Sequence, residues 1–487
     1  MKSKILLLIQ CTLFFSSYLF SQTNKIVQVE NNLTEVRAII FEDSLVQQYN
    51  ILDRMRFYKV PSVSIAVIHN GIIEWAKAYG YADIEHKTVA DTNTIYQVAS
   101  ISKSVNALGI MKLVEQNKLS LSKDIREYLK TWKFPDNELS YGKTITLKNL
   151  LSHTAGLSVR GFVGYPTSDL IPSINQILNG EKPANNEPVK PIYSPGSHYQ
   201  YSGGGSTVIR KILDDNISSN YEQLMQGLVL EPLKMGNSTF SQPLAAKYTN
   251  YAVGYDKEMK PLKGGYYVYP EQTAGGLWST ATDIAKFILE IQRSIKGGKN
   301  AFLSKNLISE MLTPVMENYG YGIGIEQKGG EKYFWHEGES YGYRSIYYGS
   351  FTSGNGVAIL TNAYPENGRP FVIEVLNSVA TAYGWKEFYN PIKKKLINVP
   401  EEIINKYVGE YFSENPAIKI SISKDKEYLT LTARQTEQLY PVEVDTFFLA
   451  SSPSDKCVFS SSKNNGVIDT FQVVQNGKVV VDARKRF

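Results

Sequence analysis

The chain is organised around one stretch, Gln97-Val98-Ala99-Ser100-Ile101-Ser102-Lys103-Ser104-Val105-Asn106-Ala107-Leu108-Gly109-Ile110-Met111. Its later apolar residues recur at helical spacing, so Ser100 and Lys103, three positions apart, should share one face of a helix's first turn. A lysine can activate a serine hydroxyl when burial or cationic neighbours lower its pKa from ~10.4. Free backbone N–H groups at the helix start would stabilise negative charge developing on a substrate. The stretch therefore indicates a serine nucleophile.

The spacing S-x-x-K is weak evidence by itself. It recurs at Ser120/Lys123, Ser421/Lys424, Ser423/Lys426 and Ser460/Lys463, and such a pair is usually a solvated surface pair. Three further segments follow the serine in order: Leu150-Leu151-Ser152-His153-Thr154-Ala155-Gly156-Leu157, Pro195-Gly196-Ser197-His198-Tyr199-Gln200-Tyr201-Ser202-Gly203 and Trp335-His336-Glu337-Gly338. The ordered set is far more specific than any one member.

This ordered set resembles the serine β-lactamase and penicillin-binding protein superfamily. The similarity is to the class C β-lactamase, esterase and D-aminopeptidase branch (peptidase family S12), whose motifs are S-x-x-K, Y-x-N and K-T-G or H-x-G. It covers roughly residues 35 to 385. The resemblance implies an α/β (α+β) fold, in which an antiparallel sheet flanked by helices adjoins a mostly helical subdomain and the site lies between them. It also implies that neither a metal nor an organic cofactor is required.

The resemblance assigns roles to four side chains. Ser100 is the expected nucleophile, and Lys103 and Tyr201 are the coupled base and proton shuttle. His336 stands where relatives carry lysine or histidine, and would orient the tyrosine or a substrate carboxylate.

Backbone groups and one departure complete the expected site. The N–H groups of Ser100 and Glu339, the latter beside Gly338, are the expected oxyanion donors. Gly203 replaces the asparagine that in relatives contacts the lysine and the substrate's amide. This departure puts specificity for β-lactams or peptides in doubt more than it affects the nucleophile.

Other residues match the motifs and leave alternatives. Tyr248-Thr249-Asn250 is a literal Y-x-N, but Tyr201 has the preceding Pro-Gly and the following glycine-rich helix start. His69-Asn70-Gly71 is a literal H-x-G, yet it precedes the serine and reads as a hairpin turn. His153 is interpreted as a structural histidine rather than a base.

Composition and the N-terminus indicate the class of protein. The 487 residues are 43% hydrophobic, which suffices for a packed core. A charged start and an apolar run through Phe20 predict a secretory signal peptide over residues 1–21. Without Lys2 and Lys4 the net charge falls from +5 to about +3, too little to argue for a nucleic-acid partner. We expect no transmembrane anchor, and lipidation of Cys11 is disfavoured by the preceding Gln10.

Cysteine usage narrows the chemistry further. Removal of the signal peptide leaves Cys457 alone, so we expect neither an internal disulfide nor cysteine or zinc-thiolate catalysis.

The expected domains are a hydrolase domain over residues 33–385, a linker over 386–402 and a small accessory β-sandwich or barrel over 403–487. Within the first we expect a helix over residues 33–59 and a hairpin about Asn70-Gly71. Ser279 or Thr280 should cap another helix.

The sequence thus predicts an exported serine hydrolase that forms an acyl-enzyme with a small ester, a D-amino-acid peptide or a β-lactam, with cell-wall fragments among the candidate substrates. The alternative is a catalytically silent penicillin-binding-like protein that binds or senses cell-wall fragments, which the joint retention of all four side chains disfavours. Aromatic residues near the expected cleft favour an apolar acyl group unless they belong to the core: Tyr165, Tyr266, Tyr267, Trp278 and Tyr341.

Overall fold

The computed structural model describes residues 22–36, 39–41, 46–425, 428–433, 435–449, 451–462 and 466–486. The expected signal peptide, with Cys11, lies outside these residues. The chain divides into two compact units: one holds the residues up to Leu33 together with Tyr49–Tyr389, and the other holds Thr34–Gln48 and Asn390–Phe487. Within the described residues, no helix has both the length and the apolar character needed to cross a membrane.

The first unit contains a seven-stranded antiparallel sheet. Across the sheet the strands are β4 (Thr88–Val89), β3 (Ile72–Asp83), β2 (Ser62–His69), β12 (Gly356–Thr361), β11 (Tyr343–Ser350), β10 (Glu331–Ser340) and β9 (Gly324–Lys328). The turn from β2 to β3 has φ of +52° at Asn70 and +78° at Gly71. Asparagine and glycine adopt this left-handed conformation readily, and the predicted hairpin is confirmed.

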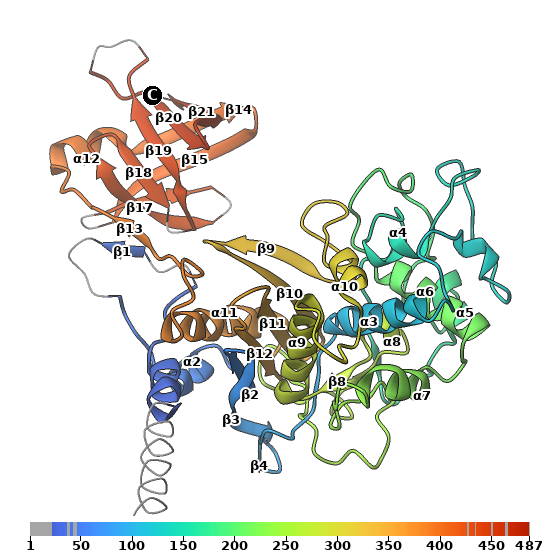
Figure 1. Ribbon diagram of the computed structural model, residues 1–487. Coiled ribbons are helices and arrows are strands. Elements are labelled where there is room, and N and C mark those ends of the chain that lie inside the picture. The colour runs from blue at the N-terminus through green and yellow to red at the C-terminus, as the bar shows by residue number, and fades with distance from the viewer. Residues whose placement is uncertain are drawn as a thin grey trace, which may run out of the picture. The chain divides into compact units, whose positions relative to one another are not determined.

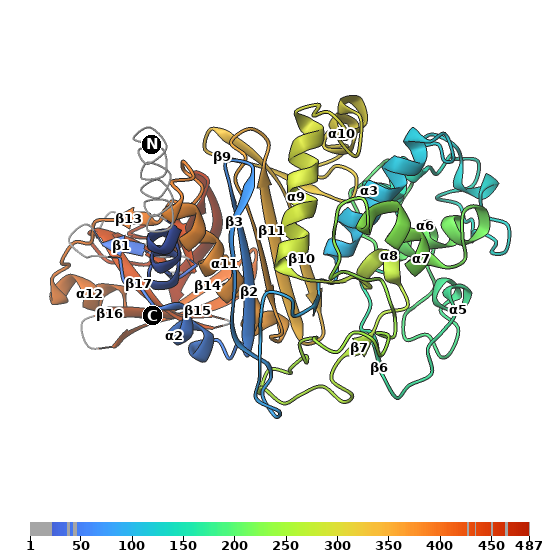
Figure 2. The ribbon, with the colours of Figure 1, turned by 60° about the horizontal axis from the view of Figure 1, so that its bottom comes forward.

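Helices cover both faces of this sheet (Figure 2). Ile65 and Val67 of β2 belong to one hydrophobic core, with helix α11 (Pro365–Ala382), whereas Ala66 and Ile68 belong to the other, with helix α9 (Ala281–Ile295). This alternation follows from the two-residue period of a strand. The side chain of Thr280 accepts the Asp283 N–H, so Thr280 is the N-cap of α9.

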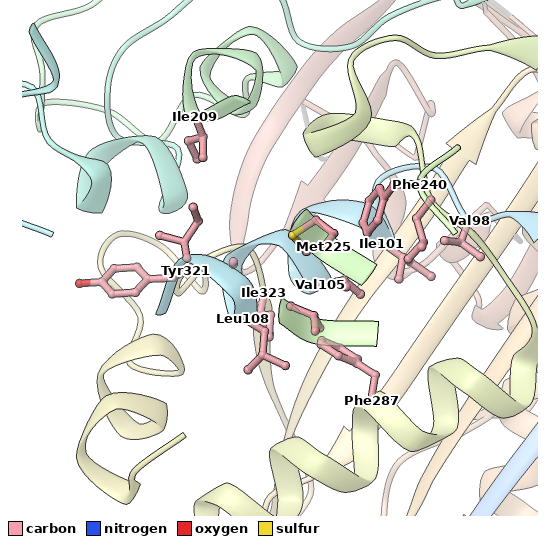
Figure 3. Close-up of a cluster of buried hydrophobic side chains, with 14 of the residues drawn as sticks. Val98, Ile101, Val105, Leu108, Ile209, Met225, Phe240, Phe287, Tyr321 and Ile323 are labelled. Atoms are coloured by element: carbon pink, nitrogen blue, oxygen red, sulfur yellow. The ribbon is translucent and has the colours of Figure 1, made fainter. Parts of the chain in front are cut away.

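The helical part of the unit surrounds helix α3 (Ile101–Glu115), as Figure 1 shows. The neighbouring helices are α4 (Leu147–Leu151), α5 (Ile174–Asn179), α6 (Gly203–Asn216), α7 (Tyr221–Met225), α8 (Gln272–Gly275) and α10 (Lys305–Met311). Figure 3 shows Val105 and Leu108 of α3 among side chains of other elements, including Met225 and Phe287. Because α3 is buried almost all round, its polar groups need internal partners, and Ser104 Oγ donates to the carbonyl of Gly322 at 2.7 Å.

The predicted helix over residues 33–59 is wrong for most of its length. Among the residues of this range that the structure describes, only α2 (Ile51–Phe57) forms a helix, while Leu33 and Tyr49 form a β-bridge. Strand β1 (Ile39–Phe41) pairs in parallel with β13 (Ile392–Lys394). Local apolar periodicity could not indicate a strand whose partner is supplied by a distant part of the sequence.

The second unit contains a closed antiparallel barrel preceded by helix α12 (Glu401–Tyr407). Its strands follow chain order: β14 (Gly409–Glu414), β15 (Ala417–Asp425), β16 (Tyr428–Thr432), β17 (Thr436–Glu443), β18 (Thr446–Leu449), β19 (Ser452–Ser460), β20 (Thr470–Gln475) and β21 (Lys478–Arg486). The expected small C-terminal β-domain is confirmed. Strands β17 and β19 contain Pro441 and Pro453, although proline usually argues against a strand interior.

Candidate active site

Ser100 lies at the turn from the short strand β5 (Tyr96–Gln97) into α3. The preceding residue, Ala99, has a φ of +46°, a left-handed conformation that is strained for alanine. The N–H groups of Ile101 and Ser102 donate to the carbonyls of Val98 and Ala99. No described residue accepts a hydrogen bond from the Ser100 N–H. This N–H is therefore available at the start of a helix, where the helix dipole also favours negative charge.

Lys103 supplies an amine directly beside the serine hydroxyl. Its Nζ lies 3.0 Å from Ser100 Oγ and donates to the carbonyl of Ala274 at 2.7 Å. Only 5% of Lys103 is exposed, and this burial lowers the pKa of its amine to about 7. A substantial fraction of the amine is therefore uncharged at neutral pH and can accept a proton.

Tyr201 and Ser202 directly precede α6, and the side chain of Tyr201 approaches the same hydroxyl of Ser100. Ser202 accepts the N–H of Gly205 and caps that helix. Burial raises the pKa of Tyr201 to about 12, partly opposed by its hydrogen bond with Ser100. The Nζ of Lys103 lies 5.0 Å from the centre of the tyrosine ring. Tyr201 therefore keeps its proton at neutral pH and can relay it, while Lys103 is the better base.

His336 is a neutral hydrogen-bonding group. Its Nδ1 lies 2.6 Å from the carbonyl of Glu337, which can only accept, so Nδ1 carries the hydrogen. The other nitrogen, Nε2, then accepts the Tyr319 hydroxyl at 2.9 Å. Burial, followed by the charges of Lys103 and Arg344, lowers the pKa of His336 to about 3.

His153 packs behind the tyrosine. Its backbone has a φ of +57°, its Nδ1 accepts the N–H of Ser202 at 3.2 Å, and its ring centre lies 4.3 Å from that of Tyr201. Burial, followed by the charges of Lys103 and His336, holds its pKa well below the usual value. His153 therefore holds Tyr201 in position, because its ring packs against the tyrosine ring and its Nδ1 fixes the neighbouring N–H of Ser202.

The backbone of β10 presents a second N–H to the site. Strands β10 and β11 are joined by the two-residue turn Tyr341-Gly342, with Ser340 opposite Tyr343. In such a hairpin the pair flanking the turn is hydrogen-bonded, so the next pair, Glu339 opposite Arg344, is not. The Glu339 N–H therefore points away from β11. The ladder with β9 ends at Trp335, which leaves that edge of β10 open.

Gly338 lies between neighbouring backbone and side-chain atoms rather than in the open site. A Cβ at this position would lie 2.0 Å from the Val98 carbonyl oxygen and 2.2 Å from Ser345 Oγ. Glycine is therefore required for β10 to approach the serine turn.

These side chains meet in one cavity of about 790 Å³. Of the residues expected from the sequence, it is lined by Ser100, Lys103, Tyr201, Gly203, His336 and Glu339. Sequence reasoning missed other lining residues: Arg160, Phe162, Val163, Tyr199, Tyr269, Tyr319, Trp335 and Arg344.

The aromatic residues that the sequence suggested near the cleft, and the competing tyrosine Tyr248, do not line this cavity. Tyr165, Tyr266 and Trp278 are buried, and Trp278 is fully buried in the core. Tyr267 and Tyr341 stack on each other. Tyr248 packs against the core around α3, and Asn250 of the competing Y-x-N bonds to Thr94 and Asp91.

The cavity wall also carries charge. Arg344 is buried and forms ion pairs with Glu337 and with Glu339, the latter at 2.8 Å. The guanidinium of Arg160 lies 5.9 Å from the centre of the Tyr201 ring.

Comparison with known proteins identifies the family of this chain. The family model described as Beta-lactamase matches residues 48–378. The chain belongs to the beta-lactamase family. A similar protein of known structure is the octameric penicillin-binding protein homologue from Pyrococcus abyssi, which is 27% identical with a TM-score of 0.59; the match covers 89% of this chain and 98% of that one. The D-amino acid amidase from Ochrobactrum anthropi SV3 shares the fold, with 20% identity, a TM-score of 0.55, and coverage of 68% of this chain and 97% of that one.

Two relatives from Staphylococcus aureus are similar over part of their length. Protein flp of strain MW2 is 28% identical over 221 residues, and these are 45% of this chain and 42% of protein flp. A teichoic acid D-alanine hydrolase is 25% identical over 252 residues, and these are 50% of this chain and 58% of the hydrolase.

Proposed function

We propose that this member of the beta-lactamase family is a serine hydrolase that works through an acyl-enzyme on Ser100. The observation that carries the proposal is the contact of 3.0 Å between Ser100 Oγ and the buried Nζ of Lys103, whose pKa burial lowers to about 7. This places a base of suitable pKa within hydrogen-bond reach of a nucleophile.

In the first half-reaction Ser100 Oγ forms a bond to the carbonyl carbon of an ester or amide, and its proton passes to Lys103. The N–H groups of Ser100 and Glu339 stabilise the negative oxygen of the tetrahedral intermediate. The bond to the leaving group then breaks, and Tyr201 relays the proton from Lys103 to the departing oxygen or nitrogen. In the second half-reaction water attacks the acyl carbon and Lys103 accepts the water's proton. The bond between the acyl carbon and Ser100 Oγ then breaks, Lys103 returns the proton to Oγ, and the carboxylic acid leaves. His336 stays neutral and orients Tyr201 or the substrate.

The finer proposal is that the protein is exported and that its substrate comes from the cell wall. The charged and apolar pattern of residues 1–21 supports export. Similarity to a teichoic acid D-alanine hydrolase supports an ester of the cell envelope. Esters, D-amino-acid peptides and β-lactams are the substrate classes to compare.

Labelling with a fluorophosphonate tests the proposal directly. Intact-mass spectrometry should show one adduct on the wild-type protein and none on Ser100→Ala. An adduct that persists in the variant would refute the assignment of the nucleophile. A wild-type protein that is neither labelled nor active on any ester or amide would favour the silent binding protein.

A further inference from the structure

The segment 158–163 is fixed against the start of α6 and the loop before α8. The N–H groups of Gly203 and Gly204 donate to the carbonyls of Arg160 and Val159, each at 3.0 Å. At its other end the carbonyl of Val163 accepts the Tyr269 hydroxyl at 3.1 Å. Hydrogen bonds to its carbonyl groups therefore hold the segment at both ends before any substrate binds.

Gly203 makes this close approach possible. A Cβ at position 203 would lie 3.0 Å from Phe162 Cε2 and 3.2 Å from the carbonyl oxygen of Arg160. Such contacts are tighter than ordinary van der Waals packing, so the ring would have to shift. The ring of Phe162 thus occupies the space that a side chain at position 203 would need.

The same segment gives the cavity an apolar surface. Phe162 is half-buried, and Val163 keeps 61% of its surface exposed, although both line the cavity. The ring of Tyr269 supports the segment from behind, because a Cβ on Gly164 would lie 2.6 Å from it. Apolar side chains that stand on a fixed backbone and line the cavity of the nucleophile are suited to contact an apolar part of a substrate.

We propose that Phe162 and Val163 form the acyl-binding wall of this site and select substrates with an apolar acyl group of a few carbon atoms. This inference rests on the proposed function and deepens it. An apolar chain gains from burial against this wall, whereas a polar acyl group must give up its water without finding a donor or acceptor on these two side chains. One methylene in an apolar pocket typically changes kcat/KM by about 10- to 200-fold.

Two esters of equal chain length test the wall: p-nitrophenyl valerate and p-nitrophenyl N-acetylglycinate, which differ by an amide in the acyl chain. We expect Phe162→Ala to lower the ratio of kcat/KM for valerate over acetylglycinate by about tenfold. Phe162→Leu should lower it less. The matched control Phe57→Ala removes an exposed phenylalanine from α2 and should leave the ratio unchanged. An unchanged ratio in Phe162→Ala overturns the proposal.

A double-mutant cycle tests the relation between Phe162 and Gly203. Gly203→Ala should lower kcat/KM for valerate because its new Cβ displaces the ring, and it should cost less in the background of Phe162→Ala, where only the close contact with the carbonyl of Arg160 remains. Equal losses in both backgrounds would contradict the proposed steric relation. Circular dichroism and thermal unfolding of each variant distinguish a local effect from loss of the fold.

Equilibrium binding separates this inference from the proposed function. Titration calorimetry of both esters with Ser100→Ala, alone and combined with Phe162→Ala, measures the wall without turnover. Preferential binding of valerate that is lost in Phe162→Ala supports the wall, even if the wild type hydrolyses neither ester. Absence of hydrolysis would refute only the proposed function. Equal binding of both esters overturns the wall. A preference for an anionic acyl group such as hemiglutarate would also overturn it, because Arg160 would then be the selecting residue of the segment.

Discussion

Lys103 Nζ contacts Ser100 Oγ at 3.0 Å, and no carboxylate among the described residues forms an ion pair with this amine. Because its pKa of about 7 results from burial, the proton of Lys103 is held weakly. The base must be uncharged to act, so we expect kcat/KM for a neutral ester to rise with pH through about 7. Lys103→Ala should lower kcat/KM by about 10²- to 10⁴-fold. A profile that is flat between pH 6 and 8 would contradict the assignment of Lys103 as the base.

Tyr201→Phe should remove most turnover while the protein stays folded, because only a hydroxyl at this place can relay a proton to the leaving group. The loss expected is about 10²- to 10⁴-fold in kcat. Tyr248→Phe is the matched control, since Tyr248 packs with the core around α3 rather than lining the cavity. Steady-state kinetics of the two variants decide the matter, and wild-type activity in Tyr201→Phe would show that the wrong tyrosine was chosen.

Features set by neighbouring residues in the sequence could be predicted. The Ser100–Lys103 pair, the Asn70-Gly71 turn and the cap at Thr280 each depend on contacts within a few positions. Strand β1 could not be predicted, because its hydrogen bonds come from β13.

The apolar side of the cavity could not be predicted for the same reason. Phe162 lines the same cavity as Ser100 because Gly203 accepts the close approach of the segment 158–163, a contact between residues about 40 positions apart. The sequence showed that Gly203 lacks a side chain, but only the fold shows what fills the space. Similarly, the sequence placed His336 in the site, but the donor to its Nε2, the hydroxyl of Tyr319, is supplied by another part of the fold.

Tyr319→Phe should destabilise the protein by about 1–3 kcal/mol, because it leaves the buried Nε2 of His336 without its donor. Urea unfolding at pH 7 measures the loss. The control is Tyr141→Phe, whose ring is largely exposed and whose hydroxyl should contribute little. If the two variants unfold at the same urea concentration, the hydrogen bond to His336 contributes nothing measurable.

Small esters should be better substrates than penicillins and cephalosporins. Gly203 offers no side chain to hydrogen-bond an amide in the acyl group, and an unmade hydrogen bond is worth ~0.5–1.5 kcal/mol, more where a buried group is left unpaired. Comparison of kcat/KM for p-nitrophenyl butyrate, a D-alanyl peptide and nitrocefin measures the preference. Nitrocefin as the best substrate by tenfold or more would make the protein a β-lactamase and this interpretation of Gly203 wrong.

Glu271 should make the stability of the protein fall as pH rises. Its carboxyl group is 0% exposed, and neither oxygen has a hydrogen-bond partner among the described residues. This burial raises the pKa of Glu271 to about 8, from an ordinary value of 4.5. Between these two values the folded chain holds a proton that the unfolded chain releases, so the free energy of unfolding decreases with pH through this window and levels off above about pH 8.

Glu271→Gln removes this titration and keeps the shape of the side chain. The difference in unfolding free energy between the variant and the wild type should therefore shift in favour of the variant from pH 5 to pH 8.5, by about 1.4 kcal/mol for each unit of pKa shift. Urea unfolding at the two pH values measures this difference, in which the buried histidines His153 and His336 cancel because both proteins contain them. Glu85→Gln, a change at an exposed carboxylate, is the control. A Glu271→Gln difference that is the same at both pH values would mean that Glu271 is already charged at pH 5 in the folded protein, and that it finds partners which stabilise the charge.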